Sequence, residues 1–559
     1  MPMSEAQSRV PVLDDLREEL SAKEVLITAQ RERITSLEGR NEALQSALIN
    51  HAHEIELLKR RLFGARSERT GTSENQLPLA GLLVDAAELQ KELDEANAAR
   101  GNASGDTTDD EPKNKDKAKP KGRRDLAQSS LPQVVVTIED PELAAKGKLL
   151  DYDISHQLGY RRGGFFVIVK RTAKYELPTA ESTTVLSAPS PKAVLSRGML
   201  HTSLIAWIIV QKFGLGVPHY RLEQQLEAEG TPLSRSVMCR NAEEVGNALG
   251  ATVVHAMIEH ARTTCGVLST DATGASIQPG PREGGPKREC DKGHFFTIVA
   301  DRDHVLFEFT SEHTSAVVAK LFKGFTGYLQ SDASSVYDIL ERGPPPLEDE
   351  SGVTLVGCWA HCRRYFFEAA LCKYDVGIEG LGRIRDIYHV DQTFKDRPPV
   401  ERQKLRAQLL APLFEGFFTW VAETRRTAPG RTLATKALGY ALNQEQELRR
   451  VLLDGRLPLD NTRSERSLRK IVVGRKNWLF YGSEIHAQGA AALFSLIASC
   501  RLHGIEPIGY LDELVRILPF WPRERFLELS PLRWVATRAR LDPAELDRPV
   551  GVITVPRAE

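Results

Sequence analysis

Apolar residues recur at every seventh position through the first part of the chain. With Leu13 as position a of a heptad, seven of the eight a positions are apolar and four of the seven d positions are leucine. The exception at a is Asn41, and a two-stranded coil tolerates one such amide because it is satisfied only opposite its twin. We therefore expect residues 1–97 to be a coiled-coil oligomerisation segment that makes a homo-oligomer. A long helix packed on its own chain is the alternative. The a residues are Leu13, Leu20, Ile27, Ile34, Asn41, Leu48, Ile55 and Leu62, and the d residues are Leu16, Lys23, Gln30, Leu37, Leu44, His51 and Leu58.

The heptads give way to a polar segment, residues 98–130, in which apolar residues nearly vanish. Such a composition buries too little surface to offset chain entropy, so we expect a disordered basic linker. Residues 113–124 carry seven basic side chains against one acidic side chain, Asp116. An arm of this kind binds DNA phosphates or enters a minor groove, which makes Arg123 and Arg124 candidate DNA contacts. A solvated linker is the alternative.

The next two segments differ in their periodicity. Residues 131–192 are β-rich and predict a small β module. Residues 193–262 have helical periodicity, with one helix over 220–229, a Gly-containing turn over 230–233 and a second helix that starts near Ser234. This outline is typical of a helix-turn-helix, so Arg235 and Arg240 are candidate DNA contacts. Plain packing of a helical hairpin is the alternative.

A third pattern alternates short apolar runs with turns and predicts a sheet. A buried strand over 265–270 ends at Asp271, and a second strand over 328–331 ends at Asp332. Between them lie a hairpin, with strands over 294–300 and 304–309, and a helix over 314–323 that stops at Gly324. This is the order of a ribonuclease-H-like sheet, in which the strand after the helix runs parallel to the first strand. The two carboxylates are then expected to lie together.

A third carboxylate, Glu465, lies on a helix for which Asp460 can serve as the N-cap. Three carboxylates suit Mg²⁺ or Mn²⁺, and a pair of such ions stabilises the attacking and leaving oxygens of a phosphodiester displacement. We therefore expect Asp271, Asp332 and Glu465 to be catalytic metal ligands that hold two ions.

Glu465 follows Asp332 by 465−332=133 residues, a gap too wide for a bare core of this kind. Residues 374–453 have helical periodicity and predict a helical insertion. The catalytic core then comprises residues 263–373 and 454–515, with a C-terminal tail at 516–559. The predicted fold class is multidomain α/β.

The chain has 74 Lys and Arg against 75 Asp and Glu, so its net charge gives no general attraction to nucleic acid. Any DNA contact must therefore come from locally basic segments. Residues 449–476 are locally basic, with nine basic side chains against three acidic ones, 9−3=+6. The side chains in this segment that we expect to follow DNA phosphates are Arg463, Arg466, Arg469, Arg475 and Lys476. The alternative is that Glu465 pairs with Arg466 or Arg469 at the surface.

The seven cysteines have no regular pairing, and neither a leader nor a membrane-length apolar run is present, so we expect a cytoplasmic protein with no membrane partner. Cys358, Cys362 and Cys372 are poorly spaced for structural zinc. We expect His361, which lies among them, to be a core residue, although a position near the DNA strand is open.

Four sequence blocks, in order, resemble signature blocks of the insertion-sequence-66 family of DDE transposases. They are GFTGYLQSDASSVY (324–337), GCWAHCRRYF (357–366), LDNTRSER (459–466) and GRKNWLFYG (474–482). LKRRLFGARSER (58–69) is similar to the amino-terminal block of the family, and LHGIEP (502–507) is similar to the carboxy-terminal block. The resemblance spans most of the chain.

This resemblance implies that Asp271, Asp332 and Glu465 match the catalytic triad of the family. It also implies a reaction in which transposon ends are cut and joined to target DNA. The family carries a cysteine zinc module near 131–192, but the first cysteine here is Cys239, so no zinc is expected. A need for accessory proteins encoded by the same element is left open. A decayed end-binding protein or regulator is one alternative, and a nuclease that cuts without joining is another.

Overall fold

The computed structural model describes nine residues between 23 and 39, residue 126, and residues 131–558 with gaps at 162, 179–182, 196–197, 281–288, 343–351 and 429. The chain divides into two units, residues 1–124 and 125–559. The described residues of the first unit are helical, and Ile34, at a predicted a position, is 54% exposed. Most of the heptad segment and the basic arm with Arg123 and Arg124 lie outside the described residues.

The second unit begins with the β module that the sequence predicts. Strand β3 is central, since β1 pairs with it in parallel and β2 and β4 pair with it antiparallel. Val167 and Ile168 are adjacent residues of β3 and both are fully buried, so both faces of the sheet are covered at this point. The elements are β1 Gln133–Ile138, α3 Pro141–Lys146, β2 Lys148–Arg161, β3 Gly164–Pro178 and β4 Thr183–Ser187.

A helical region follows, and it contains the two helices that the sequence predicts on either side of Gly230. Gly230 has a positive φ of 72°, which a glycine adopts without strain. Helix α6 packs on α17 (Glu484–Leu502) with the backbones in close approach, since a Cβ on Gly246 would lie 2.6 Å from the carbonyl oxygen of Gly489. The elements are α4 Thr202–Ile209, π-helical η2 Val210–Gly214, α5 His219–Ala228, α6 Arg235–Leu249, π-helical η3 Gly250–Val254 and α7 His255–Thr264.

The central sheet has five strands in the order β7-β6-β5-β8-β9. Strands β5, β6 and β7 pair antiparallel, whereas β8 lies parallel to β5 and β9 lies parallel to β8. The predicted order of strand, hairpin, helix and parallel strand is thus confirmed. The elements are β5 Val267–Ile277, β6 Asp291–Ala300, β7 His304–Thr310, α8 Ser315–Leu321, β8 Gly327–Gln330, 3-10 helix η4 Ser335–Tyr337, α9 Ile339–Arg342 and β9 Val353–Val356.

The prediction that the first strand ends at Asp271 is wrong. Strand β5 continues to Ile277, so Asp271 lies in its middle, opposite Thr297 of β6. The turn-prone residues after Asp271 stay extended because each of them pairs with β6, from Ala272 opposite Phe296 to Ile277 opposite Asp291. Local turn preference is overridden here by strand pairing.

Helix α17 covers the outer edge of this sheet. The hydroxyl oxygens of Ser499 and Ser495 accept hydrogen bonds from the backbone N–H groups of Val305 and Phe307 on β7, at 3.0 and 2.8 Å. Both serines are fully buried. An edge strand normally exposes unpaired backbone groups. Here a helix satisfies four of them, since both hydroxyls also donate to the carbonyl oxygens of Val305 and Phe307.

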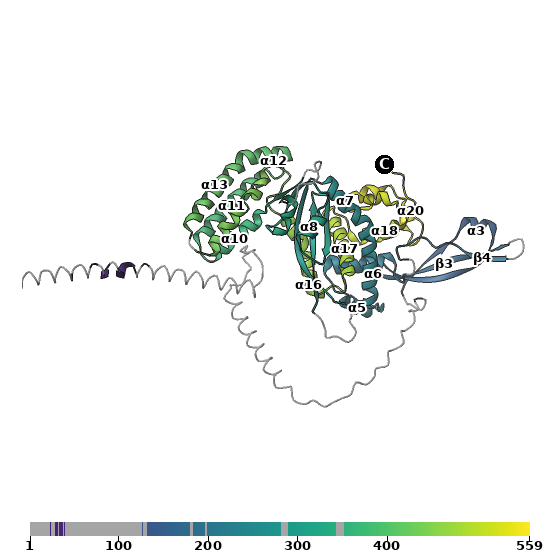
Figure 1. Cartoon of the computed structure of the whole chain (residues 1–559). Coiled ribbons are helices and arrows are strands. Elements are labelled where there is room, and N and C mark those ends of the chain that lie inside the picture. The colour runs from purple at the N-terminus through teal and green to yellow at the C-terminus, as the bar shows by residue number, and fades with distance from the viewer. Residues whose placement is uncertain are drawn as a thin grey trace, which may run out of the picture. The chain divides into compact units, whose positions relative to one another are not determined.

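The stretch after β9 is helical, as the labelled helices α10 to α13 show in Figure 1. It has its own core, built around the fully buried Trp359. The buried Arg406 donates to Asp391 at 2.8 Å and to the carbonyl oxygens of Val451 and Leu457, each at 2.8 Å, so it ties these helices to the segment that leads into α16. The elements are α10 Trp359–Leu371, α11 Asp375–Thr393, α12 Pro399–Leu405, π-helical η5 Arg406–Leu410, α13 Ala411–Thr427, α14 Leu433–Asn443, α15 Glu445–Arg449 and 3-10 helix η6 Arg450–Leu452.

The last part of the chain returns to the central sheet. The segment expected to be a tail is folded, because Trp534, Leu541 and Ile553 are buried in the same core as the sheet. Within the described part of the chain, no helix combines the length and apolar character that crossing a bilayer requires. The elements are α16 Thr462–Trp478, α17, α18 Pro507–Ile517, 3-10 helices η7 Leu518–Phe520 and η8 Arg523–Leu529, α19 Pro531–Ala539 and α20 Pro543–Asp547.

Candidate functional site

Asp271 and Asp332 come from neighbouring strands of the central sheet. Asp271 is in the middle of β5, and Asp332 follows the end of β8, which lies beside β5 in parallel. Backbone N–H groups hold each carboxylate: Ala272 donates to Asp271 at 2.8 Å, and Ser334 donates to Asp332 at 3.3 Å. The parallel pairing therefore brings together two carboxylates that are 61 residues apart (332−271).

Glu465 reaches the same place because Asn461 fixes the start of α16. The fully buried Asn461 donates from Nδ2 to the carbonyl oxygen of Thr270, at 3.2 Å, and accepts from the Cys358 thiol at 3.1 Å. Thr270 directly precedes Asp271, so one amide ties the helix that carries Glu465 to the strand that carries the first aspartate. An unmade hydrogen bond at such a buried amide costs about 1–3 kcal/mol, which favours this one arrangement.

The N-cap prediction requires a correction, because the N-cap residue of α16 is Asn461 and not Asp460. The Asp460 carboxylate still accepts from the Thr462 N–H at 3.0 Å and also from the Tyr388 hydroxyl at 2.8 Å. The Asn461 side chain makes no capping bond, because it bonds Thr270 of β5 and Cys358 before α10 instead.

The electrostatics of Asp271 show that the three carboxylates act on one another. The pKa of Asp271 is raised to about 7, mainly by burial and in addition by the negative charges of Asp332 and Glu465, against the lowering effects of the Ala272 N–H and Arg364. Carboxyl groups that disfavour each other's ionised form are typical of sites that bind cations or move protons.

Two side chains of α10 face Glu465. Its Oε1 lies 3.5 Å from Nη2 of Arg364 and 3.7 Å from Nε2 of His361. Burial lowers the pKa of His361, and Arg364 lowers it further, while Glu465 and Asp332 raise it. His361 is therefore half-buried beside the carboxylates rather than within the apolar core, and Glu465 pairs with α10 instead of Arg466 or Arg469.

The arrangement fits hard divalent cations. All three carboxylates offer oxygen ligands only, which is the donor set that Mg²⁺ and Mn²⁺ prefer. The buried phenol of Tyr337 closes one side, since it lies near enough for Asp332 and Asp271 to raise its pKa, a shift caused mainly by burial. Asp271, Asp332 and Glu465 are thus the residues that could hold a metal here.

The predicted basic segment divides into paired and exposed side chains. Arg449, Arg450 and Arg456 are ion-paired with Glu415, Glu341 and Asp454, at 2.9, 2.6 and 2.7 Å. Arg475 donates to Thr273 Oγ1 at 3.1 Å and to the Gly274 carbonyl oxygen on β5, so it holds α16 on the sheet. Five exposed basic side chains remain along α16, namely Arg463, Arg466, Arg469, Lys470 and Lys476.

Their successive spacings of three, three, one and six residues place these five side chains, hereafter the α16 basic stripe, on one broad side of the helix. The stripe begins next to Glu465. Partial burial lowers the pKa of Arg463, and the charges of Arg302, Arg402 and Arg466 lower it further. The structure thus gathers like charges, an arrangement that favours an anionic partner.

The other predicted DNA contacts in the described residues lie on a different helix from the α16 basic stripe. Arg235 and Arg240 are exposed on α6, and the Arg235 N–H donates to Glu223 at 3.0 Å.

Cys358, Cys362 and Cys372 are buried, and Cys358 is the thiol that bonds Asn461. Sequence reasoning missed Asn461 and Tyr337. It favoured the core for His361 and left open that His361 and Arg364 lie near the DNA strand. The signal available was that all four stand in the sequence blocks that flank the carboxylates.

Comparison with known proteins adds family matches. The sequence model described as "Transposase IS66 family" matches residues 197–489, more than half of the chain. A second model, described as "Transposase C of IS166 homeodomain", matches residues 52–136.

Similar whole proteins are also found. Two uncharacterized proteins of Sinorhizobium fredii match, y4qI at 26% identity over 92% of this chain and 94% of that protein, and y4hP at 27% over 86% and 88%. A third, y4jD of the same organism, is 25% identical over 89% of this chain and 96% of that protein.

Among solved structures, the Drosophila P element transposase strand transfer complex matches 55% of this chain and 81% of that chain. The sequence identity is 12% and the TM-score is 0.21, a similarity too low to support an argument about this fold.

Proposed function

Since the chain belongs to the IS66 transposase family, we propose that it is a DDE transposase that cuts transposon ends and joins them to target DNA. The observation that supports this proposal is electrostatic. Asp332 and Glu465, which come from two other elements, both lie near enough to Asp271 to raise its pKa.

The three carboxylates would hold two divalent ions, Mg²⁺ or Mn²⁺. When bound, such ions activate the attacking oxygen and stabilise the leaving oxygen of a phosphodiester displacement. Side chains of the protein would supply the remaining functions, which are positioning, charge neutralisation and proton transfer. Asn461 holds Glu465 against β5, and Arg364 offers a guanidinium beside Glu465 that can neutralise a DNA phosphate. His361, kept neutral by burial, can accept a proton at this edge of the site.

The strand order β7-β6-β5-β8-β9 supports a ribonuclease-H-like core for this enzyme. The core is interrupted by helices α11 to α15, and the β module and helix-turn-helix-like region precede it. Arg235 and Arg240 on α6 and the arm with Arg123 and Arg124 are proposed further DNA contacts. The heptads support a homo-oligomer formed through residues 1–97.

A cleavage and joining assay tests the proposed reaction. Full-length protein incubated with labelled DNA that ends in the element's terminal repeat, plus Mn²⁺, should give both nicked strands and strands joined to a target duplex. Nicked products without joined products would indicate a hydrolytic nuclease. Binding of the end DNA with neither product would indicate a regulator that binds transposon ends.

The α16 basic stripe should control the salt dependence of DNA binding. Each phosphate contact adds about 0.9 to the slope of log affinity against log salt, so the double variant Arg466→Ala/Arg469→Ala should lower the slope by about 2. Fluorescence anisotropy over a range of salt concentrations measures this slope.

The matched control is Arg425→Ala/Arg426→Ala, which removes the same charge from exposed positions at the end of α13. We expect its slope to equal that of the unsubstituted protein. An unchanged slope in the α16 variant, with both variants folded, would show that DNA does not run along this helix.

A further inference from the structure

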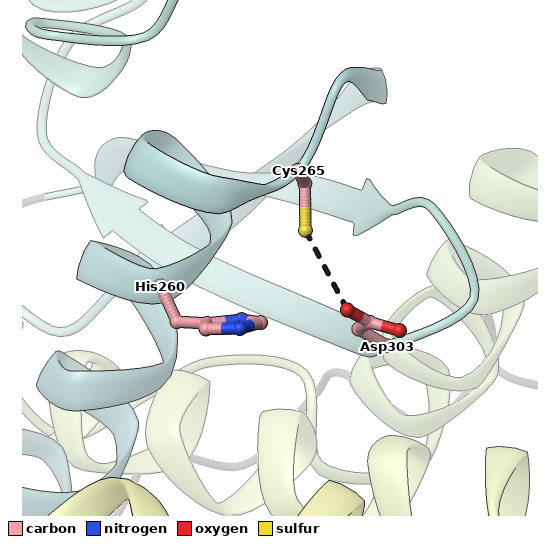
Figure 2. A group of neighbouring side chains, drawn as sticks. All are labelled: His260, Cys265 and Asp303. Carbon is pink, nitrogen blue, oxygen red and sulfur yellow. Dashed lines mark hydrogen bonds between the residues drawn. The ribbon is translucent and has the colours of Figure 1, made fainter.

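A second group of metal-ligating side chains lies at the turn end of the β6–β7 hairpin, apart from the three carboxylates. It consists of His260, Cys265 and Asp303, and one potential ligand atom from each residue lies within 4.8 Å of the others. Figure 2 shows the three side chains converging from α7, from the residue that leads into β5, and from the β6–β7 turn. Three separate elements therefore meet here.

The distances suit a tetrahedral cation. The Cys265 Sγ lies 3.9 Å from Oδ2 of Asp303. A zinc ion with bonds of 2.3 Å to sulfur and about 2.0 Å to oxygen would set these two atoms about 3.5 Å apart. A contraction of a few tenths of an ångström, within the range of side-chain adjustment, would therefore allow both atoms to bind one ion.

The surroundings orient the imidazole of His260. Its Nδ1 lies 3.1 Å from Nε2 of His304, which is fully buried. When His260 donates through Nδ1, its Nε2 keeps a lone pair, and this is the arrangement that histidine ligands of metals adopt. A buried second histidine in this position acts as the orienting partner.

The turn that carries Asp303 is fixed from two sides. His503 donates to the backbone carbonyl oxygen of Asp303 at 2.8 Å, and the Asp301 carboxylate accepts from the Gly266 N–H at 3.0 Å. The second bond joins the turn directly to the residue after Cys265. The positions of two ligands are thus set by backbone contacts before any ion binds.

We infer that His260, Cys265 and Asp303 bind a divalent cation of borderline softness, such as Zn²⁺, with water as the fourth ligand. The mixed nitrogen, sulfur and oxygen donors favour zinc over Mg²⁺ or Ca²⁺. Binding forms a zinc–thiolate bond and releases the Cys265 proton to the buffer. The ion would join the end of α7, the start of β5 and the β6–β7 turn. This site is independent of the proposed reaction and of the zinc module that the sequence lacks.

Metal titration tests the site in full-length protein stripped by a chelator. The Asp332→Asn background weakens the carboxylate site, so that zinc bound there is not counted. We expect one equivalent of Zn²⁺ to bind in competition with a chromophoric chelator. Co²⁺ should then give the near-ultraviolet absorption of a thiolate-bound cobalt ion. Cys265→Ser should abolish that absorption and weaken zinc binding at least tenfold, on the order seen when metal sites lose supporting groups.

The matched control is Cys290→Ser, which replaces an exposed cysteine outside the group and should leave both signals unchanged. Should Cys265→Ser fail to fold, as judged by circular dichroism, Asp303→Asn tests the same site at a half-exposed turn and should also weaken zinc binding. The absence of stoichiometric zinc binding, or full affinity with the thiolate absorption kept in folded Cys265→Ser, would overturn the inference.

Discussion

Asp332→Asn, Asp271→Asn and Glu465→Gln should each lower the rate of strand cleavage by at least about a thousandfold, while affinity for end DNA stays near that of the unsubstituted protein. Each change removes one metal-binding charge and keeps the side-chain volume. A bound ion contributes several kcal/mol to the transition state, and each 1.36 kcal/mol corresponds to a factor of ten in rate. Single-turnover cleavage in Mg²⁺ and a parallel anisotropy titration measure the two effects.

Glu484→Gln is the matched control for this series, since Glu484 is an exposed acid in the first turn of α17. It should cleave at the normal rate. If one of the three site variants also cleaves normally, that residue does not belong to the catalytic site, and the proposal for it fails.

The affinity of the carboxylate site for Mn²⁺ should rise steeply with pH and level off above about pH 7. Burial and the neighbouring carboxylates raise the pKa of Asp271 to about 7, so below that pH a proton occupies the group that the cation needs. Competition by one proton changes the apparent affinity about tenfold per pH unit. Calorimetric titration at several pH values between about 5 and 8 follows the change.

Asp271→Asn is the control for this pH dependence, because it removes the proton that competes with the ion. Its residual affinity should be flat over the same range. An unsubstituted protein with constant affinity would show that Asp271 is ionised throughout and would contradict the raised pKa.

The same shift makes a prediction for the metal-free protein. The fold prefers protonated Asp271, so the stability that this group contributes is full below the ordinary carboxyl pKa of 3.8 and is lost as the pH rises to about 7. Asp271→Asn carries no charge at any pH, so it should melt a few degrees above the unsubstituted protein at pH 8 and at the same temperature near pH 4.

The sequence predicts the central sheet well because each of its strands has a local apolar pattern. The hairpin around Asp301–Asp303, the helix that stops at Gly324 and the buried strand before Asp332 are all read from short runs and turn residues. Their order alone then implies that β8 lies parallel to β5. The features that depend on distant pairing are not predictable in this way. β5 continues past Asp271 only because β6 lies beside it.

The surroundings of the carboxylates were less predictable than the carboxylates themselves. His361 lies in an apolar block, so local pattern places it in the core, whereas α10 turns it toward Glu465. The role of Asn461 depends on a carbonyl oxygen 191 residues earlier in the chain (461−270). A contact of that range leaves no periodic signal, and only the resemblance of the surrounding block marks it as unusual.

The late position of Asn461 and Glu465 has a consequence for incomplete copies of the protein. A chain whose synthesis stops between residues 333 and 460 would hold Asp271 and Asp332 but would lack both the third acid and the amide that seats it. Such a fragment would also lack α17, which packs on α6 and on the edge of the central sheet, so any DNA contact would fall to the segments before α6. If the chain acts as the proposed transposase, frameshifted or prematurely terminated genes would yield fragments that occupy transposon ends without cutting them, and damaged copies would restrain intact ones.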